Sequence, residues 1–378
     1  MSIQSKSLLL SKKLGGKIQI CSKVKLDKKN LPVLYTPGVA DVSRAIAEDK
    51  NLAKVYTIKK NTVAVVSDGS AVLGLGNIGP EAALPVMEGK ALLFKELAGV
   101  DAFPIVLATQ DTEEIIKTVK ILAPTFGGIN LEDICAPRCF EIEERLKKEL
   151  DIPVFHDDQH GTAIVVLAGL INALKVVKKD VRKIKIVVSG AGAAGIAITK
   201  LLLKYGATDI IMIDRRGIIY EDRDGEMNSA KKEISRITNR GKLKGNIRDA
   251  LFGADVFIGV SAPNILTEDD IQKMNKKAIV FAMANPVPEI MPDRAHSCGC
   301  YIMATGRSDF PNQLNNVLAF PGIFRGALDN HIKTITDEHK IKAARAIAGL
   351  IKKPTTDKII PAALDRKVAK AVARVFKN

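Results

Sequence analysis

Four acidic side chains occur in this sequence as two adjacent pairs, and each pair follows a short apolar run. Glu132 and Asp133 close the run GGINL, and Asp157 and Asp158 close the run IPVF. In an open parallel sheet the carboxyl ends of the strands line the ligand crevice, so we expect the four carboxylates to converge there. Converging carboxylates raise one another's pKa unless a cation compensates them, and oxygen ligands suit Mg²⁺ or Mn²⁺. The residues alone leave open that these are ordinary solvated acids at strand ends.

The second acid pair lies inside the segment H-D-D-Q-H (156–160), in which two histidines stand four residues apart. A zinc protease motif needs both histidines on one face of a helix. The residues before His156 are extended, and Gly161 and Thr162 follow directly after His160, so we expect the helix to begin after the motif. Asp is also shorter than the Glu that such enzymes use as a base. The segment therefore does not favour a zinc protease.

A glycine-rich turn follows the strand KIKIVV and opens a helical pattern. Its residues are Gly190, Gly192, Ala193, Ala194 and Gly195. The first glycine permits the turn, the second lets a pyrophosphate approach the backbone, and the third lets helix and strand pack closely. The diphosphate then lies on the N–H groups at the helix N-terminus. This context predicts a dinucleotide site.

Asp214 ends the next predicted strand, where a carboxylate can bond the ribose hydroxyls of adenosine. Asp214 favours NAD because it would repel a 2′-phosphate, whereas Arg215 and Arg216 beside it could accommodate one. The choice between NAD and NADP therefore stays open. A second glycine pattern at 74–79 lacks an acid at the end of a following strand, and we expect it to be a tight loop.

Short apolar runs alternate with helical patterns along most of the chain, which predicts parallel strands and an α/β fold. We expect an N-terminal α/β domain with the substrate and metal residues over 1–160. A Rossmann-type doubly wound parallel-sheet domain follows over 161–378, and its helical C-terminus, from about 334 to 378, is expected to pack back on the first domain. In detail, the patterns predict strands at 63–66, 102–108, 255–261, 278–285 and 301–306, a helix over 80–99, and helix caps at Asp111 and Thr267.

Over nearly its whole length the chain resembles the malic enzymes of the short prokaryotic type. The matching segments are LYTPGVA (34–40), SDGSAVLGLGNIG (67–79), PVMEGKALLF (85–94), INLEDICAPRCF (129–140), VFHDDQHGTA (154–163), VSGAGAAGI (188–196), ANPVPEI (284–290) and LNNVLAFPGIFRGALD (314–329). The resemblance implies oxidative decarboxylation of L-malate to pyruvate and CO₂ with reduction of NAD or NADP. It also implies a homodimer or larger homo-oligomer.

The same resemblance implies roles for the acids by position. Glu132, Asp133 and Asp158 would be ligands of Mg²⁺ or Mn²⁺, and Asp157 would be the partner of the catalytic lysine. This resolves the choice between metal ligands and solvated acids in favour of the metal.

The remaining roles also come from the resemblance. Tyr35 and Lys90 match the acid–base pair of the family, and Asn285, Asn315 and Asn316 match its substrate-side asparagines, Asn285 also lying at the cofactor. Lys90 could take the proton of the C2 hydroxyl if an apolar or cationic environment lowers its pKa, and Tyr35 could protonate the enol carbon.

One position departs from the larger malic enzymes. They carry an arginine two residues after the glycine of the D-G turn, where it binds a malate carboxylate, and here that residue is Ala71. Arg138 and Arg44 are the two candidates for a replacement.

Composition limits the other partners. Lys and Arg exceed Asp and Glu by 57 − 42 = 15, which attracts anions of any kind, but aromatic residues make up only 4% and there is no Trp for bases to stack on. We therefore expect no nucleic-acid partner. We also expect no membrane partner, because no uncharged apolar run approaches ~18 residues. Five cysteines without C-x-x-C spacing favour reduced thiols, and with no secretory leader pattern we expect a cytoplasmic protein.

Three other activities fit parts of the pattern. A malolactic enzyme shares these motifs but releases lactate without net cofactor reduction. A simple 2-hydroxyacid dehydrogenase would explain the glycine turn but not the strand-end acids, and it would accumulate oxaloacetate. A non-enzymatic nucleotide- or anion-binding protein would need no metal and would show no turnover.

Overall fold

The first lobe is built on a four-stranded parallel sheet with the strand order β2-β1-β3-β4. The computed structural model describes residues 3–225 and 227–377. The strands of this sheet are β1 (Thr62–Ser67), β2 (Asp101–Val106), β3 (Gly128–Leu131) and β4 (Val154–His156). Its helices are α5 (Pro80–Ala98), α6 (Thr112–Leu122) and α7 (Arg138–Glu149), with short 3₁₀ turns at η2 (Ile58–Lys60) and η3 (Ala123–Thr125).

Helices cover both faces of this sheet. Val63 and Val65 of β1 share a hydrophobic cluster with α5, whereas Ala64 and Val66 share another with α6 and α7. Successive side chains of a strand point to opposite faces, so a continuous apolar strand needs a layer on each side. The predicted helix over 80–99 is confirmed, since α5 spans Pro80–Ala98 and ends at a left-handed Gly99. The predicted cap at Asp111 is also confirmed, since its side chain accepts from the Glu114 N–H at the start of α6.

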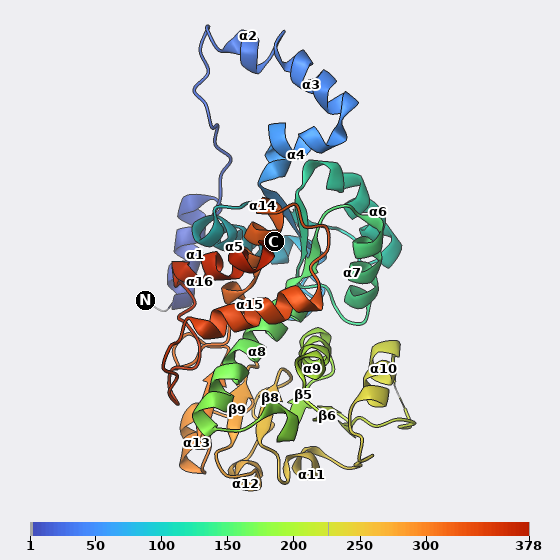
Figure 1. Cartoon of the computed structure of the whole chain (residues 1–378), viewed down its shortest axis with the longest axis vertical. Helices are drawn as coiled ribbons and strands as arrows, with labels where there is room; N and C mark the ends of the chain where they lie inside the picture. The colour runs from blue at the N-terminus through green and yellow to red at the C-terminus, as the bar shows by residue number, and fades with distance from the viewer. Residues whose placement is uncertain (1–2, 226, 378) are drawn as a thin grey trace.

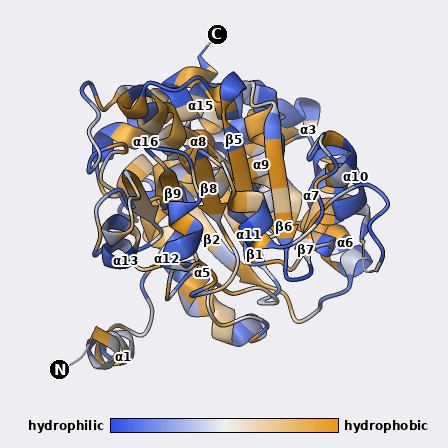
Figure 2. Ribbon diagram, turned by 90° about the horizontal axis from the view of Figure 1, so that it is seen from below, coloured by the Kyte–Doolittle hydropathy of each residue, from blue (hydrophilic) through white to orange (hydrophobic). Residues whose placement is uncertain are grey.

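The second lobe is a doubly wound sheet with the order β10-β9-β8-β5-β6-β7, parallel except for β7. Its strands are β5 (Lys185–Ser189), β6 (Asp209–Asp214), β7 (Gly217–Ile218), β8 (Val256–Gly259), β9 (Ile279–Ala282) and β10 (Ile302–Thr305). Its helices are α9 (Ala193–Tyr205), α10 (Ser229–Ile237), α11 (Ile247–Leu251), α12 (Glu268–Gln272) and α13 (Pro292–Ser297), with η4 at Val181–Lys183. The predicted α/β class is confirmed, and Thr267 caps α12 as expected. Figure 2 shows β5, β6 and β8 as hydrophobic strands at the centre of this lobe.

Helix α8 (Asp157–Val177) joins the two lobes and contributes to the largest hydrophobic cluster of the molecule. It runs from the first sheet into the second lobe, where it packs along α9 (Figure 1). Among the described residues it alone has the length and apolar composition of a membrane span, but 78% of its apolar window is buried inside the protein. That burial is the property of a core helix.

The expected start of this helix was wrong. We expected it after His160, but α8 begins at Asp157, because His156 is already the extended residue before the helix and the two acids occupy its first turn. Acidic side chains are favourable there, since the N-terminus of a helix carries partial positive charge. Gly161 is inside the helix, and a Cβ at that position would lie 1.9 Å from the Asp157 Oδ1 atom.

The C-terminal helices return to the first lobe (Figure 1). They are α14 (Phe320–Asp329), α15 (Asp337–Gly349) and α16 (Arg366–Ala373), with η5 (Asn316–Leu318) before them and η6 (Arg374–Phe376) at the end. Phe320 and Phe324 lie 4.7 and 5.4 Å from the Phe94 ring of α5 (centroid to centroid), and Arg366 pairs with Glu96 at 3.3 Å. The last 60 residues therefore help to hold the helix that carries Lys90.

The N-terminal arm, residues 3–58, differs from the rest of the chain. It contains α1 (Ile3–Leu14), α2 (Leu31–Leu34), α3 (Val39–Glu48), η1 (Lys50–Leu52) and α4 (Ala53–Tyr56), and α2, α3 and α4 contain no buried residue. Helices α2 and α3 stand at one end of the long axis, away from the sheets (Figure 1). Of the 27 large apolar side chains exposed in the described part of the chain, 18 belong to this arm. Such a concentration is typical of a surface that another chain covers.

Candidate active site

The two acid pairs meet because the strands that precede them are neighbours. β3 and β4 pair in parallel with Leu131 opposite His156, so the residues that follow leave the sheet at the same edge. Carboxylate oxygens of Glu132, Asp133 and Asp158 all lie within 4.8 Å of one another. The Asp133 N–H also donates to the Asp158 Oδ2 atom at 2.8 Å. The sequence predicted this convergence, and the structure contains it.

Lys90 reaches the same place from α5. Its Nζ atom lies 2.6 Å from the Asp157 Oδ2 atom and 2.9 Å from the Glu132 Oε1 atom, and the residue is 7% exposed. It also lies 4.3 Å from the centroid of the Phe320 ring. Burial lowers the pKa of Lys90, but the charges of Asp157 and Glu132 outweigh it and raise the pKa above its usual value. A lowered pKa was the condition for Lys90 to take the substrate proton, and the two carboxylates oppose it here by stabilising the charged form of Lys90.

The acids outnumber the available positive charge. Four carboxylates lie around a single lysine, and burial raises the pKa of Asp133 to about 9, with the charges of Asp158 and Glu132 adding to the shift. Burial likewise raises the pKa of Glu132, Asp157 and Asp158. The Asp133 Oδ2 and Asp157 Oδ1 atoms are buried without a hydrogen-bond partner. Buried unpaired charge is costly, so the donor set fits a hard divalent cation held by Glu132, Asp133 and Asp158.

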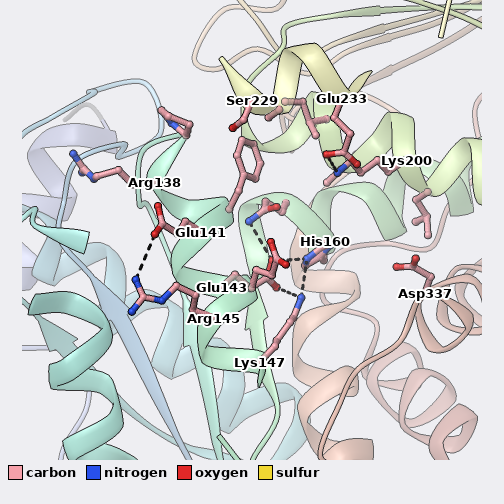
Figure 3. Close-up of a pocket in the computed structure, with 18 of the residues that line it drawn as sticks. Arg138, Glu141, Glu143, Arg145, Lys147, His160, Lys200, Ser229, Glu233 and Asp337 are labelled. Atoms are coloured by element: carbon pink, nitrogen blue, oxygen red, sulfur yellow. Dashed lines mark hydrogen bonds and ion pairs between the residues drawn. The ribbon is translucent and has the colours of Figure 1, made fainter. Parts of the chain in front are cut away.

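Glu143 of α7 contacts both ends of H-D-D-Q-H, through the backbone of His156 and the ring of His160, and Figure 3 shows the contact with His160. Its carboxylate accepts from the His156 N–H at 3.1 Å and from the Gln159 side chain at 3.3 Å, and it bonds the His160 Nε2 atom at 2.8 Å. Lys147 completes the cluster at 2.5 Å. Burial lowers the pKa of His160 to about 4, so this ring is neutral near pH 7. The metal-binding group found among the described residues consists of Glu132, Asp133 and Asp158 and includes neither histidine.

Glu143 is a residue that sequence reasoning missed. It is 4% exposed, and its contacts with His160 and Lys147 overcome its burial and hold its pKa well below the usual value. Glu143 bonds the last residue of β4 and two residues in the first turn of α8. These bonds fix the segment that carries Asp157 and Asp158. The amphipathic pattern of α7 placed Glu143 on the buried face, and a charged residue on that face was the available signal.

Glu143 lies on the wall of a cleft of about 680 Å³ between the two lobes. Figure 3 shows Glu141, Arg145 and Lys147 of α7 on one side and Lys200 of α9 and Glu233 of α10 on the other. The lining residues include none of the predicted metal ligands and none of the glycines of the 190–195 turn. This cleft therefore lies beside the acid cluster and does not contain it.

The structure does not bring Tyr35 to Lys90 within one chain. Tyr35 follows α2 in the N-terminal arm and is 67% exposed, whereas Lys90 is buried in α5. The two elements lie far apart along the long axis of the molecule (Figure 1). Among the described residues, helices α2, α3 and α4 of the arm bury no side chain, so no packing holds Tyr35 against the lobe that carries Lys90.

The three asparagines differ in their surroundings. The Asn315 side chain caps η5 by accepting from the Val317 N–H at 2.9 Å. The Asn316 Cβ atom is 3.0 Å from the position that a Cβ would take on Gly161, one helical turn from Asp157. Asn316 therefore packs against the first turns of α8, the helix that begins with Asp157 and Asp158. Asn285 follows β9, and its carbonyl oxygen lies 3.4 Å from where a Cβ on Gly74 would be, so the 74–79 loop and the second lobe meet here.

The two arginine candidates are also separated. Arg138 donates to the Asp68 Oδ2 atom at 2.9 Å and to the Ser70 Oγ atom at 3.1 Å, in the loop that contains Ala71. Arg44 pairs with Asp41 in the exposed arm. Only Arg138 is placed beside the acid cluster within one chain.

The glycine turn has the geometry that its spacing predicted. Gly190 has a φ of +108°, and a Cβ there would lie 2.5 Å from the Val260 carbonyl oxygen. A Cβ on Gly195 would lie 1.8 Å from the Gly190 carbonyl oxygen, whereas one on Gly192 would meet nothing within 4 Å. Helix α9 begins at Ala193 without a side-chain cap, so its first N–H groups, including that of Ala194, are available to a diphosphate.

Asp214 ends β6 beside this turn, and Arg215 and Arg216 follow it at exposed positions. Its carboxylate is 7% exposed and pairs with Arg223 and Lys231, both at 2.7 Å. The carboxylate was predicted to be open to a ribose, but it already has partners from its own chain.

Comparison with known proteins covers the whole chain. The family model described as malic enzyme, N-terminal domain, matches residues 15–147, and the one described as malic enzyme, NAD binding domain, matches residues 159–377. A protein of Bacillus subtilis named bifunctional malic/malolactic enzyme is 58% identical over 99% of this chain and 92% of its own length.

Two further relatives differ in the cofactor that their names carry. An NAD-dependent malic enzyme of Geobacillus stearothermophilus is 60% identical over 95% of this chain and 75% of its own length. An NADP-dependent malic enzyme of Halomonas elongata is 47% identical over 93% of this chain and 83% of its own length. Among solved structures, that of an NAD-dependent malic enzyme from Thermotoga maritima has a TM-score of 0.96 and 53% identity, covering 98% of this chain and 99% of that one.

Proposed function

Because this chain belongs to the malic enzyme family and is an NAD(P)-dependent decarboxylating malate dehydrogenase, we propose that it converts L-malate to pyruvate and CO₂ with Mg²⁺ or Mn²⁺ at Glu132, Asp133 and Asp158. The observation that carries this proposal is the set of three carboxylates within 4.8 Å, next to a buried lysine. A dehydrogenase that only oxidises a 2-hydroxy acid would have no use for such an excess of buried negative charge.

In this proposal Lys90 exchanges the proton of the substrate C2 hydroxyl. It is the only cation paired with the acid cluster among the described side chains, and Asp157 holds its Nζ atom at 2.6 Å. Asp157 is fully buried, so it orients Lys90 and remains shielded from water. When bound at the 190–195 turn, the dinucleotide would supply a hydride acceptor, and a divalent cation held by Glu132, Asp133 and Asp158 would supply Lewis-acid stabilisation of negative charge. Asn316 and Arg138 are the groups best placed to orient the substrate carboxylates.

We also propose that the active form is a homodimer or larger homo-oligomer in which the N-terminal arm of one copy covers another. The arm carries two-thirds of the exposed large apolar side chains in the described chain, and its exposed Tyr35 has no role within its own lobe. A second copy is the occupant that brings Tyr35 to a Lys90. The five free cysteines are consistent with a cytoplasmic enzyme.

Mixing two inactive variants tests this arrangement. Tyr35→Phe and Lys90→Ala, refolded together in equal amounts, should regain about a quarter of the wild-type sites if Tyr35 acts across subunits, because half of the dimers then hold one intact site. No recovery in demonstrably mixed dimers would mean that each subunit uses its own Tyr35 or none. A monomer with full activity in sedimentation and kinetic measurements would contradict the proposal.

A second candidate is a malolactic activity, since the Bacillus subtilis relative carries both activities in its name. The same carboxylates and Lys90 would serve both reactions up to the loss of CO₂. The two differ in whether the reduced cofactor leaves or returns its hydride to pyruvate.

One assay separates these reactions. The purified protein is mixed with L-malate, Mn²⁺ and either NAD⁺ or NADP⁺, and reduced cofactor, pyruvate, lactate and oxaloacetate are followed together. We expect reduced cofactor and pyruvate in equal amounts. Lactate without net cofactor reduction would show a malolactic enzyme, and oxaloacetate accumulation would show a simple dehydrogenase.

A further inference from the structure

Glu289 is a fully buried acid in the segment between β9 and α13, and the reaction described above gives it no role. Its Oε1 atom accepts from the Ser261 N–H, and its Oε2 atom accepts from the Ala284 N–H, both at 3.0 Å. Burial raises the pKa of Glu289, and the bonds from these two N–H groups oppose the rise. Burying a carboxylate is costly, so its bonds to two separate backbone segments call for an explanation.

The two segments that Glu289 joins leave neighbouring strands at one edge of the sheet. Ser261 follows β8 and Ala284 follows β9, and these strands pair in parallel with Gly259 opposite Ala282. The carboxylate fills the space beside Gly259, where a Cβ would lie only 2.5 Å from the Glu289 Oε1 atom. One side chain therefore fixes how the chain leaves both strands.

The same contacts reach the start of the diphosphate turn. The Ser261 Oγ atom lies 2.9 Å from the Oγ atom of Ser189, the last residue of β5. A Cβ on Gly190 would lie 3.2 Å from the Ser261 Cβ atom. Glu289 thus holds Ser261 against the end of β5 as well as beside the end of β9.

The strand order tells which half of a dinucleotide lies at this edge. β6 flanks β5 on one side and β8 and β9 follow on the other, so the strand order reverses between β5 and β8. A dinucleotide binds across such a point, with its adenosine at the end of β6. The nicotinamide half therefore belongs over the ends of β8 and β9. Asn285, which is half-buried, directly follows Ala284 there.

We propose that Glu289 is a positioning residue for the nicotinamide half of the cofactor site: its carboxylate fixes the segments after β8 and β9 and so holds Ser261 and Asn285 in place before the cofactor binds. Groups that are already ordered lose less freedom on binding, which strengthens the binding of the ligand. This inference rests on the proposed NAD(P)-dependent reaction and adds to it a residue that acts through the backbone of Ser261 and Ala284.

Binding of NADH and of ADP-ribose separates a local effect from a general one, because ADP-ribose has the adenosine and the diphosphate but no nicotinamide. Glu289→Gln keeps the size of the side chain but turns an NH₂ group towards one of the two N–H donors. We expect this variant to weaken NADH by about tenfold and ADP-ribose by less than about threefold. Glu289→Ala removes both acceptors and should weaken NADH further. Calorimetry measures both ligands, and nicotinamide fluorescence gives a second value for NADH.

Asp255→Asn is the matched control, because Asp255 joins β8 to β5 at the opposite edge of the same sheet. Its Oδ2 atom accepts from the Lys185 N–H at 2.9 Å, and the residue is 7% exposed. This variant should also lower Tm, but both ligands should bind within about threefold of their wild-type dissociation constants.

The proposal is overturned if Glu289→Gln binds NADH as the wild type does, or if it weakens NADH and ADP-ribose equally. An equal loss of NADH binding in Asp255→Asn would also overturn it, because any loss of stability in this lobe would then have the same effect. Circular dichroism and thermal melts show which variants are folded, and Glu289→Gln decides the question if Glu289→Ala does not fold. Because neither malate nor metal is present, these results hold even if the decarboxylation proposal fails.

Discussion

Each of the two parallel sheets ends in acidic side chains, and the surrounding chain compensates them in opposite ways. Beyond β3 and β4, Glu132, Asp133, Asp157 and Asp158 share one cation, Lys90, and their pKa values are raised by burial. Beyond β6, the single Asp214 has two cations, and its pKa is lowered. Both sites lie at the carboxyl ends of strands, so their positions in the sheets do not explain the difference.

The difference shows where each site needs a charge from outside. The first cluster leaves two buried carboxylate oxygens without partners and so fits a divalent cation. The second already has two cations of its own chain on one carboxylate and needs no further cation. A strand-end acid is thus a metal ligand, a sugar acceptor or an anchor for cations, depending on the charges that its neighbours supply.

Removing a carboxylate from the first cluster should have the largest effect. Asp158→Ala should lower Mn²⁺-dependent turnover by about 10³-fold or more, because the cation contributes several kcal/mol of transition-state stabilisation. Initial rates over a Mn²⁺ titration provide the measurement, with Asp151→Ala, whose side chain is 88% exposed, as control. An unchanged Mn²⁺ titration in Asp158→Ala would remove Asp158 from the metal site.

Removing the only cation of that cluster should have the next largest effect. Lys90→Ala should reduce turnover by about 10²–10⁴-fold while cofactor binding stays intact, because proton transfer by one positioned group has that magnitude. Lys95→Ala is the control from the same helix, since Lys95 pairs with Asp101 and its side chain is 55% exposed. Normal turnover in Lys90→Ala would exclude its proposed role.

Metal binding should stabilise the first site and leave the second unaffected. At about 100 times its dissociation constant, Mn²⁺ should add about 2.7 kcal/mol to the free energy of unfolding, which raises Tm by a few degrees. Asp133→Asn should abolish most of this shift, and Asp214→Asn should retain it. Thermal melts of chelator-treated protein with and without Mn²⁺ measure the rise in Tm for each variant. An equal rise in Asp133→Asn and Asp214→Asn would contradict the assignment of the cation to the first site alone.

The smallest expected effect is on stability at the second site. Asp214→Asn should lower the free energy of unfolding by about 1–3 kcal/mol, because it removes a charged acceptor from buried Arg223. The folded pKa of Asp214 is below its unfolded value of 3.8, so its contribution is fully present well above pH 4 and is lost as the pH falls. Urea unfolding should therefore show that the difference in the free energy of unfolding between wild type and variant becomes smaller below pH 4. If this difference instead became larger below pH 4, the pKa of Asp214 would have to be raised by folding rather than lowered.

The position of the acids could be predicted because it depends on local rules. Apolar runs mark strands, parallel strands end at one edge, and so Glu132 and Asp158 had to approach each other. The start of α8 was predicted too late, because Gly161 was taken as a helix breaker although it makes room for the Asp157 side chain inside the helix. Neither the bonds of Glu143 to His156 and His160 nor the bond of Asp214 to Lys231 could be predicted, since these partners come from other elements.

By itself, the amino-acid sequence determined the two α/β units, the dinucleotide turn at 190–195, the acids at the strand ends and the family to which the chain belongs. These follow from periodicity and from short motifs, which act over a few residues. Only the tertiary structure decided that Lys90 lies between Glu132 and Asp157, that Asp214 is neutralised by Arg223 and Lys231, and that Tyr35 stands apart in the N-terminal arm. Electrostatic energies depend on distance and burial, and those quantities exist only once distant segments have packed together.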